Sequence, residues 1–247
     1  MNRSNPFFKE TTYASVNTNF ATQSEVMTVD GTINKSIILL ALATVTAGFS
    51  WWYGITHPAM IYPFLMIGIF GGLIMAFITS FSPKSSPVTA PIYALLEGFF
   101  LGAISLLLNS FYPGIVFQAV LLTIGVFFAM FFAYKTGFIQ VTQQFRSGVV
   151  AATGGIFLVY LSTWILGMFG INIPYIHGSG MIGIGFSLFV VVLAALNLVL
   201  DFDFIDQSAR EGAPKYMEWF AAFGLIVTLI WLYVEILKLL SKLSSND

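Results

Sequence analysis

Apolar residues form seven long runs along the chain, and short polar stretches separate them. A membrane-spanning helix needs about 20 mostly apolar residues, because the hydrocarbon layer is about 30 Å thick and a helix rises about 1.5 Å per residue. Each run is long enough to cross a bilayer. The runs cover residues 35–54, 59–81, 89–109, 114–134, 148–169, 180–200 and 217–240.

The stretches between the runs contain helix-breaking residues. Examples are His57-Pro58, Tyr112-Pro113-Gly114 and Gly212-Ala213-Pro214. Within the runs, apolar and polar residues do not alternate, as they would in the strands of a transmembrane barrel. The pattern therefore predicts an all-α, polytopic membrane protein with seven transmembrane helices.

Composition supports this class and narrows the function. The chain is 57% hydrophobic and only 9% charged, whereas a soluble domain is about 25% charged. The lipid bilayer is therefore the expected surrounding. The net charge of −1 offers no electrostatic basis for binding nucleic acid, and the absence of cysteine excludes disulfides and thiolate chemistry.

Polarity also divides the chain into two parts. Residues 1–32 are polar and rich in Ser, Thr and Asn, which predicts a flexible tail. Residues 33–247 form the predicted membrane domain. The tail lacks the apolar core and cleavage site of a secretory signal, so we expect the first membrane helix to drive insertion.

Lysine and arginine alternate between the loops, and this alternation predicts the orientation. The tail and the loops after the second, fourth and sixth runs carry basic residues, and the other loops carry none. We therefore expect a cytoplasmic N-terminus. Lys238 and Lys242 would lie outside if the last run crosses fully. A crossing helix is favoured, and a tilted, broken or re-entrant helix is the alternative.

Three acids fall in or beside apolar runs, where an ionisable residue is costly and is a candidate for function. Glu97 lies inside the third run, Glu235 late in the seventh, and Asp201 at the end of the sixth. Each has a plainer interpretation. Glu97 could be a structural hydrogen-bonded acid, Glu235 could pair with Lys238 three residues later, and Asp201 could be a boundary charge.

Buried carboxyls of this kind can carry protons or cations. Burial raises the pKa of a carboxyl, and a second acid nearby raises one of the two further. A pair can therefore share a proton or hold a cation. Glu97 with Asp201 or Asp203 is one such pair on the cytoplasmic side. Gly98 and Gly102 form a small-xxx-small motif beside Glu97, which predicts close helix packing there.

Catalytic chemistry has little support in the sequence. The only histidines, His57 and His177, fall in outer loops, whereas most acids fall on the inner side. That arrangement suits neither a zinc hydrolase nor a serine protease. The Gly-x-Gly-Asp context of intramembrane aspartyl proteases is also absent. We expect no enzymatic activity, no catalytic residue, no bound metal and no cofactor.

Several segments resemble the bacterial Bax inhibitor-1/YccA family. The most specific are LNLVLDFDFID ending at Asp206, APKYMEW at 213–219 and LIWLYVEILKLL at 229–240. Weaker ones are EGFFLGAIS at 97–105, YKTGFI at 134–139 and SNPFF at 4–8. The resemblance implies a bundle in the bacterial inner membrane in which the other six helices surround the last one.

The resemblance also implies a function. Family members are described as pH-sensitive calcium leak channels and as modulators of membrane-protein quality control. In the channel-like members an acid on the sixth helix pairs with an acid on the seventh. These positions match Asp201, which has the aliphatic Ile205 four residues later, and Glu235, which directly follows Leu232-Tyr233-Val234. Here the second acid is Glu rather than Asp, and it lies about 27 Å beyond the start of the last run.

Two functions follow as hypotheses. The first is an ion leak that passes Ca²⁺ or H⁺, with pH sensitivity set by Asp201, Glu235, Glu97 and Asp203. The second is a quality-control modulator that binds a membrane protease or another membrane partner through the polar tail. The two hypotheses do not exclude each other.

Overall fold

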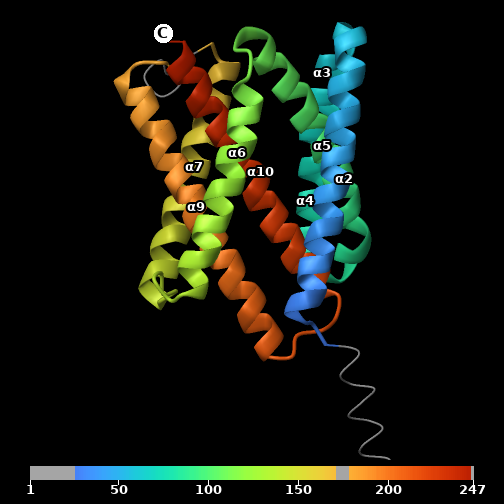
Figure 1. Cartoon of the computed structure of the whole chain (residues 1–247), viewed down its shortest axis with the longest axis vertical. Coiled ribbons are helices and arrows are strands. Elements are labelled where there is room, and N and C mark those ends of the chain that lie inside the picture. The colour runs from blue at the N-terminus through green and yellow to red at the C-terminus, as the bar shows by residue number, and fades with distance from the viewer. Residues whose placement is uncertain (1–25, 171–177, 246–247) are drawn as a thin grey trace, which may run out of the picture.

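The computed structural model describes residues 26–170 and 178–245, and this part of the chain contains helices and no strands (Figure 1). Seven helical spans in it are long and apolar enough to cross a membrane, which confirms the predicted fold class. The spans are α2 (Val29–Thr56); a second span made of η1 (Pro58–Met60), α3 (Ile61–Met66), η2 (Ile67–Gly71) and α4 (Gly72–Phe81); η3 (Pro83–Ser85) with α5 (Ser86–Phe111); α6 (Ile115–Lys135); α7 (Gln143–Met168); α9 (Met181–Arg210); and α10 (Met217–Ser244).

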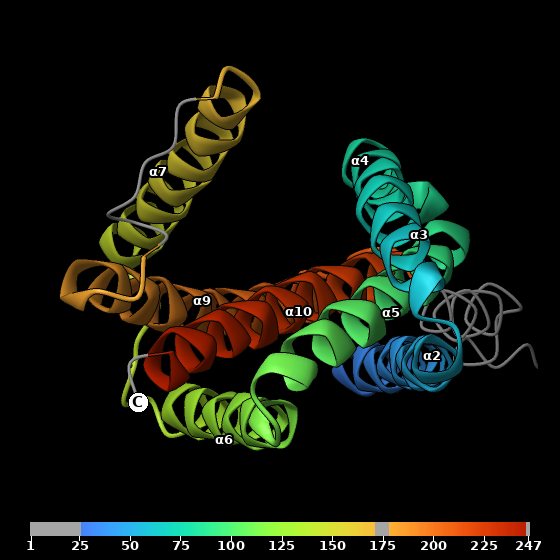
Figure 2. The same cartoon turned by 90° about the horizontal axis from the view of Figure 1, so that it is seen from above.

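Helix α10 occupies the centre of the bundle. It packs mainly against α2, α5, α6 and α9, and Figure 2 shows α7 beyond α9 and the α3–α4 span beyond α5. In its most apolar window 56% of the residues are buried, the largest share among the seven spans. The last helix is therefore central, although four helices rather than six supply most of its contacts.

The ends of two helices differ from the sequence prediction. Helix α9 continues to Arg210, ten residues beyond the predicted end of the sixth run, so Asp201 lies within a helix rather than at its boundary. The prediction was wrong because the apolar pattern marks bilayer thickness, whereas the first strong helix breaker is the left-handed Gly212. Helix α2 starts at Val29, inside the predicted tail, and residues 1–25 lie outside the described part.

The last helix is unbroken. Helix α10 runs for 28 residues, or about 42 Å, from the end where α2 begins to the opposite end of the bundle (Figure 1). A broken or re-entrant last helix is therefore excluded, and the favoured crossing agrees with this geometry.

Gly98 and Gly102 lie where α5 meets α2. A Cβ atom on Gly98 would collide with the Ala43 carbonyl and the Thr46 hydroxyl, and one on Gly102 would collide with the Ala47 carbonyl. The backbones of α2 and α5 can approach this closely because neither position has a side chain.

We predict that Gly98→Ala destabilises the protein by about 1–3 kcal/mol, since the added methyl group must displace backbone atoms of α2. Gly154→Ala on α7 is the matched control, because nothing lies within 4 Å of its Cβ position. Thermal unfolding in detergent measures both variants. Equal melting temperatures for the two would contradict the close contact.

Candidate functional site

Asp201 lies inside the bundle and faces α10. Its carboxyl lies beside Thr228, whose hydroxyl donates to Gly224 O at 3.2 Å, and its Oδ1 atom is 3.8 Å from the position that a Cβ on Gly224 would occupy. The Oδ2 atom is buried and has no hydrogen-bond partner in the described part of the chain. Asp201 is therefore an interior residue of α9 with one unpaired carboxyl oxygen, and it does not mark a helix end.

Glu235 is 1% exposed and lies between α7 and α10. Its Oε1 atom accepts a hydrogen bond from Lys238 Nζ at 3.0 Å, and its Oε2 atom accepts one from the Tyr160 hydroxyl at 3.0 Å. Lys238 Nζ also lies 5.0 Å from the centroid of the Tyr160 ring. The predicted local pair between Glu235 and Lys238 is thus present. Tyr160 of α7 adds a hydrogen bond to the second carboxylate oxygen.

The structure does not bring Asp201 and Glu235 into contact. Thr228, which lies beside Asp201, is seven residues before Glu235 on α10, so the two carboxyls are separated by about 10 Å along the helix. They do lie along the same face of α10, because residues 224, 228, 231 and 235 project to one side of a helix with about 3.6 residues per turn.

Trp231 occupies that face between the two acids. Its side chain packs against the apolar cluster that joins α7 and α9, which consists of Val149, Ile156, Val190 and Leu193. Any path from Asp201 to Glu235 along this face therefore passes the indole ring.

Glu97 lies towards a different face of α10. Its carboxyl lies beside Tyr93, four residues earlier on α5, and the Tyr93 ring is 5.0 Å from Phe223 of α10. Phe223 projects about 100° from Gly224 and about 140° from Thr228 around the axis of α10, on a different face of the helix. The structure therefore forms no pair between Glu97 and Asp201.

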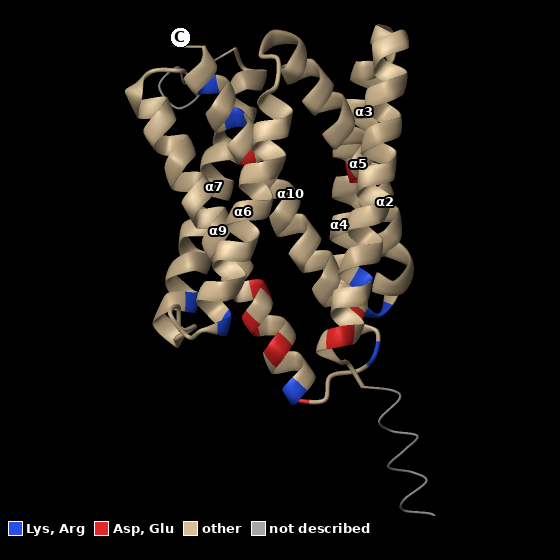
Figure 3. Ribbon diagram, viewed as in Figure 1, with Lys and Arg blue, Asp and Glu red and all other residues tan. Residues whose placement is uncertain are grey.

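Asp203 belongs to a polar network at the end of the bundle. Its Oδ2 atom is 2.6 Å from the Arg146 guanidinium, which also donates to Gln207. One helical turn later, Asp206 pairs with Arg210 at 2.6 Å. Figure 3 shows these charges gathered at the end of α9. Asp203 links α9 to α7 and contacts neither Asp201 nor Glu97.

Sequence reasoning missed Glu218, which is fully buried at the start of α10. Its Oε1 atom accepts hydrogen bonds from Thr28 N at 3.0 Å, Thr28 Oγ1 at 2.9 Å and Lys215 Nζ at 2.7 Å. Thr28 in turn caps α2 by accepting from Gly31 N. The sequence shows only an acid in the first turn of an apolar run. That pattern does not indicate that Thr28, 190 residues earlier, binds the carboxyl.

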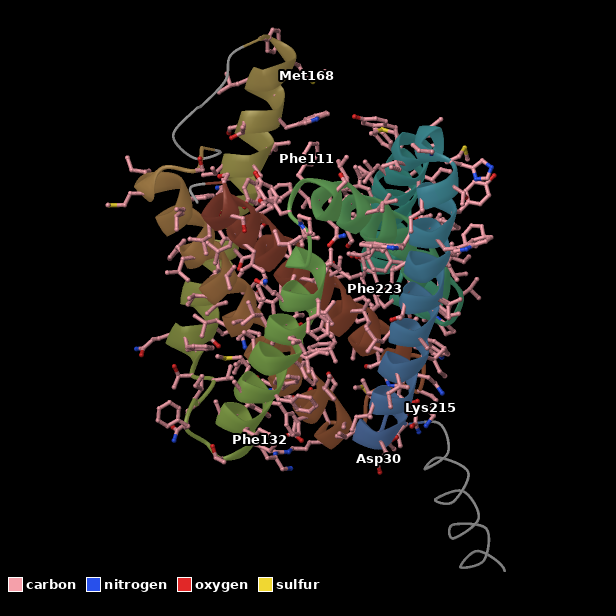
Figure 4. The ribbon with its side chains drawn as sticks, turned by 45° about the horizontal axis from the view of Figure 1, so that its top comes forward. Asp30, Phe111, Phe132, Met168, Lys215 and Phe223 are labelled. Carbon is pink, nitrogen blue, oxygen red and sulfur yellow. The ribbon has the colours of Figure 1, made fainter. Side chains whose placement is uncertain are left out.

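Further contacts hold the same junction. Met27 N donates to Ala213 O at 2.7 Å, and Val26 forms an antiparallel bridge with Pro214. Asp30 and Lys215 mark this end of the bundle in Figure 4. The segment before α2 is therefore fastened to the connection between α9 and α10.

We predict that Glu218→Gln lowers the unfolding free energy by about 1–3 kcal/mol, because charge-assisted hydrogen bonds to Thr28 and Lys215 are lost at a buried site. Glu211→Gln, at an exposed position seven residues earlier, should change it by less than about 0.5 kcal/mol. Thermal unfolding of both variants in detergent tests this. Equal effects would show that the junction contributes no stability.

Lys238 and Lys242, the two lysines at the opposite end from most basic residues (Figure 3), contact groups within the bundle. Lys238 binds Glu235, and Lys242 Nζ donates to Gly183 O at 3.0 Å and Ser187 Oγ at 2.8 Å. Their positions are thus explained by internal partners, and they do not contradict the orientation expected from the loops.

The described residues contain no group of three His, Asp or Glu side chains close enough to hold a metal ion. His57 stacks on Tyr53 at 4.3 Å, and His177 lies outside the described residues. Ca²⁺ takes six to eight oxygen ligands. The Asp201 site supplies a carboxylate and a hydroxyl, so water would have to complete the shell of a passing ion.

Comparison with protein families decides the relationship. The family model described as Bax inhibitor 1 like matches residues 5–245. The chain belongs to this family. No curated protein and no solved structure matches it. The match spans all seven helices of the Bax inhibitor 1 like chain, from the residues before α2 to the end of α10.

Proposed function

We propose that this Bax inhibitor 1 like protein is a pH-sensitive cation leak that passes Ca²⁺, or H⁺, across the bacterial inner membrane. The proposal includes a cytoplasmic N-terminus and no enzymatic activity. The observation that carries it is the placement of Asp201 and Glu235 along one face of the central helix. Glu97 and Asp203 lie off this face, so passage is assigned to the first two acids.

The polar groups on this face support a path along α10. Asp201 of α9 lies beside Thr228, in the half of α10 nearer its start, and Glu235, with Tyr160 of α7 bound to it, lies in the other half. Lys242 and Ser187 follow one to two turns beyond Glu235. Buried ionisable groups within a bundle commonly mark ion pathways. The unpaired Oδ2 atom of Asp201 is the group best able to take up a cation.

Sensitivity to pH follows from competition at the carboxyls. A proton and a cation use the same oxygen atoms, so Ca²⁺ binding at Asp201 should weaken as the pH falls and the neutral form accumulates.

Reconstitution tests the proposal. The full-length protein in liposomes loaded with a calcium-sensitive dye should admit Ca²⁺ faster than empty liposomes, with a rate that depends on pH. Asp201→Asn and Glu235→Gln should each change that rate, whereas Asp206→Asn should not. Flux equal to that of empty liposomes at every pH would refute the leak function, as would unchanged flux in both variants.

Trp231→Ala is predicted to increase the leak about tenfold, which corresponds to a barrier lower by about 1.4 kcal/mol. The indole lies between the two carboxyl sites, and apolar constrictions oppose hydration of a path. Trp219→Ala, near the start of α10 and on a different face, is the control. A leak that falls in Trp231→Ala would place the path elsewhere.

Binding of a membrane protease or another membrane partner through the N-terminal tail is a second candidate. It is supported by the attachment of residues 26–28 to the α9–α10 connection, which ties the tail to the start of the central helix. Deletion of residues 2–25 keeps this attachment. A partner recovered with the full chain and lost with the deletion would support the idea, and one retained by both proteins would refute it.

A further inference from the structure

Glu97 is embedded at mid-depth in its helix. It lies eleven residues after Ser86, where α5 begins, which is about 17 Å along the axis. Tyr93, one turn earlier on α5, is the polar side chain beside it, and none of the ion pairs in the described part of the chain includes it. The carboxyl therefore lies far from either end of the bundle and has no counter-ion.

The helix opposite Glu97 is shaped to receive it. The π-helical turn η2 lies directly before Gly72. Three glycines of this span face α5, namely Gly68, Gly71 and Gly72. A Cβ atom on Gly68 would collide with Phe100, and one on Gly72 would collide with the Glu97 carboxyl. π-Helical turns within α-helices occur frequently at functional sites. A glycine-lined cradle therefore holds the carboxyl against the backbone of α4.

No other charge balances this carboxyl. Neither η2 nor α4 contains a titratable residue. The titratable residues of α2, namely Asp30, Lys35 and Tyr53, lie towards its two ends, and His57 directly follows it. Helix α10 contacts α5 through the Tyr93 and Phe223 rings and, two turns beyond Glu97, through Tyr233, whose hydroxyl is 2.6 Å from Ser105 Oγ. An ionised carboxylate with no counter-ion pays a desolvation penalty of several kcal/mol, which the neutral acid avoids.

We propose that Glu97 is a membrane-embedded proton-binding site, separate from Asp201 and Glu235, whose bound proton keeps the α4–α5 contact closed. The ligand is H⁺. Loss of the proton leaves an uncompensated anion between α5 and the glycine face of α4 and pushes the two helices apart. The site goes beyond the proposed leak path, because it contacts a different face of α10 from Asp201 and Glu235.

Lipid-soluble carbodiimide tests the site, because it reacts with protonated carboxyls in apolar surroundings. The acid proton moves to one carbodiimide nitrogen, and the carboxylate oxygen bonds to the central carbon. The adduct rearranges to an N-acylurea that retains the whole reagent. Mass spectrometry of peptides from the full-length protein in liposomes should therefore find one added reagent molecule on Glu97.

Labelling of Glu97 should decrease with rising pH, by about tenfold per pH unit once the carboxyl is mostly ionised. Glu97→Gln should lose the adduct. Tyr93→Phe should retain it, since the cradle stays intact. A water-soluble carbodiimide should label exposed Glu211 and leave Glu97 unmodified.

Two outcomes would overturn the proposal. One is an unlabelled Glu97 in the folded protein at every pH when the denatured chain is labelled there. The other is equal labelling of Glu97 by the water-soluble and lipid-soluble reagents, which would place it in water. Asp201→Asn protein should label at Glu97 as the wild type does. Calcium flux in the same liposomes is scored separately, so this site and the leak function can fail independently.

Discussion

Asp201→Asn is expected to lower the calcium leak about a hundredfold, which corresponds to a barrier higher by about 2.7 kcal/mol. The amide keeps the shape of the side chain and its contact with Thr228, but it cannot become anionic. A passing cation then loses the charged oxygen beside Thr228. The part of the pH response that arises at Asp201 should disappear with it.

Asp206→Asn is the matched control for this prediction. It removes an acid from the same helix, five residues later, where the carboxyl is partly exposed and paired with Arg210. Flux should change little, because this residue lies at the end of the bundle. Equal losses in the two variants would show that the general charge of α9, and not the site beside Thr228, controls the leak.

Lys238→Met is expected to destabilise the protein by about 3 kcal/mol at neutral pH. The substitution leaves the Glu235 carboxylate, whose side chain is 2% exposed, without its cation, and an uncompensated buried charge costs about 3–5 kcal/mol. We expect the lower end of this energy range, because Tyr160 still donates a hydrogen bond to the Glu235 carboxylate. Chemical unfolding of the protein in detergent measures it.

The double variant Lys238→Met/Glu235→Gln provides the control. Removing the acid as well as its partner should recover most of the lost stability. Lys238→Arg should behave as the wild type does, since it keeps the charge. A double variant as unstable as Lys238→Met would show that the lysine acts through packing and not through Glu235.

Particular residues show how far sequence reasoning reaches for the site. Glu235 could be recognised as a buried acid because its neighbours are apolar, and its pairing with Lys238 follows from a spacing of three residues. Tyr160 could not be found in this way, because it lies 75 residues earlier on another helix. The same holds for Thr28 and Glu218, whose contact depends on how the ends of α2 and α10 meet.

Asp201 shows that the end of a helix is harder to predict from the sequence than its apolar run. The end of the apolar run placed it at a helix boundary, whereas α9 continues to Arg210 and turns the carboxyl towards Gly224. Bilayer thickness fixes the length of an apolar run, but local breakers and capping fix the end of a helix. The predicted helix end was ten residues too early, and the longer helix favours the interior position of Asp201 over the alternative of a boundary charge.

By itself, the sequence determined the class of protein, the number of spans and the set of costly acids. These follow from local properties: the length of apolar runs, the spacing of breakers and the scarcity of charge. The tertiary structure decided which acids share a face of α10, that Glu97 lies towards a different face, and that Trp231 stands between Asp201 and Glu235. Those relations depend on the rotation and offset of packed helices, which long-range side-chain contacts set and local pattern does not.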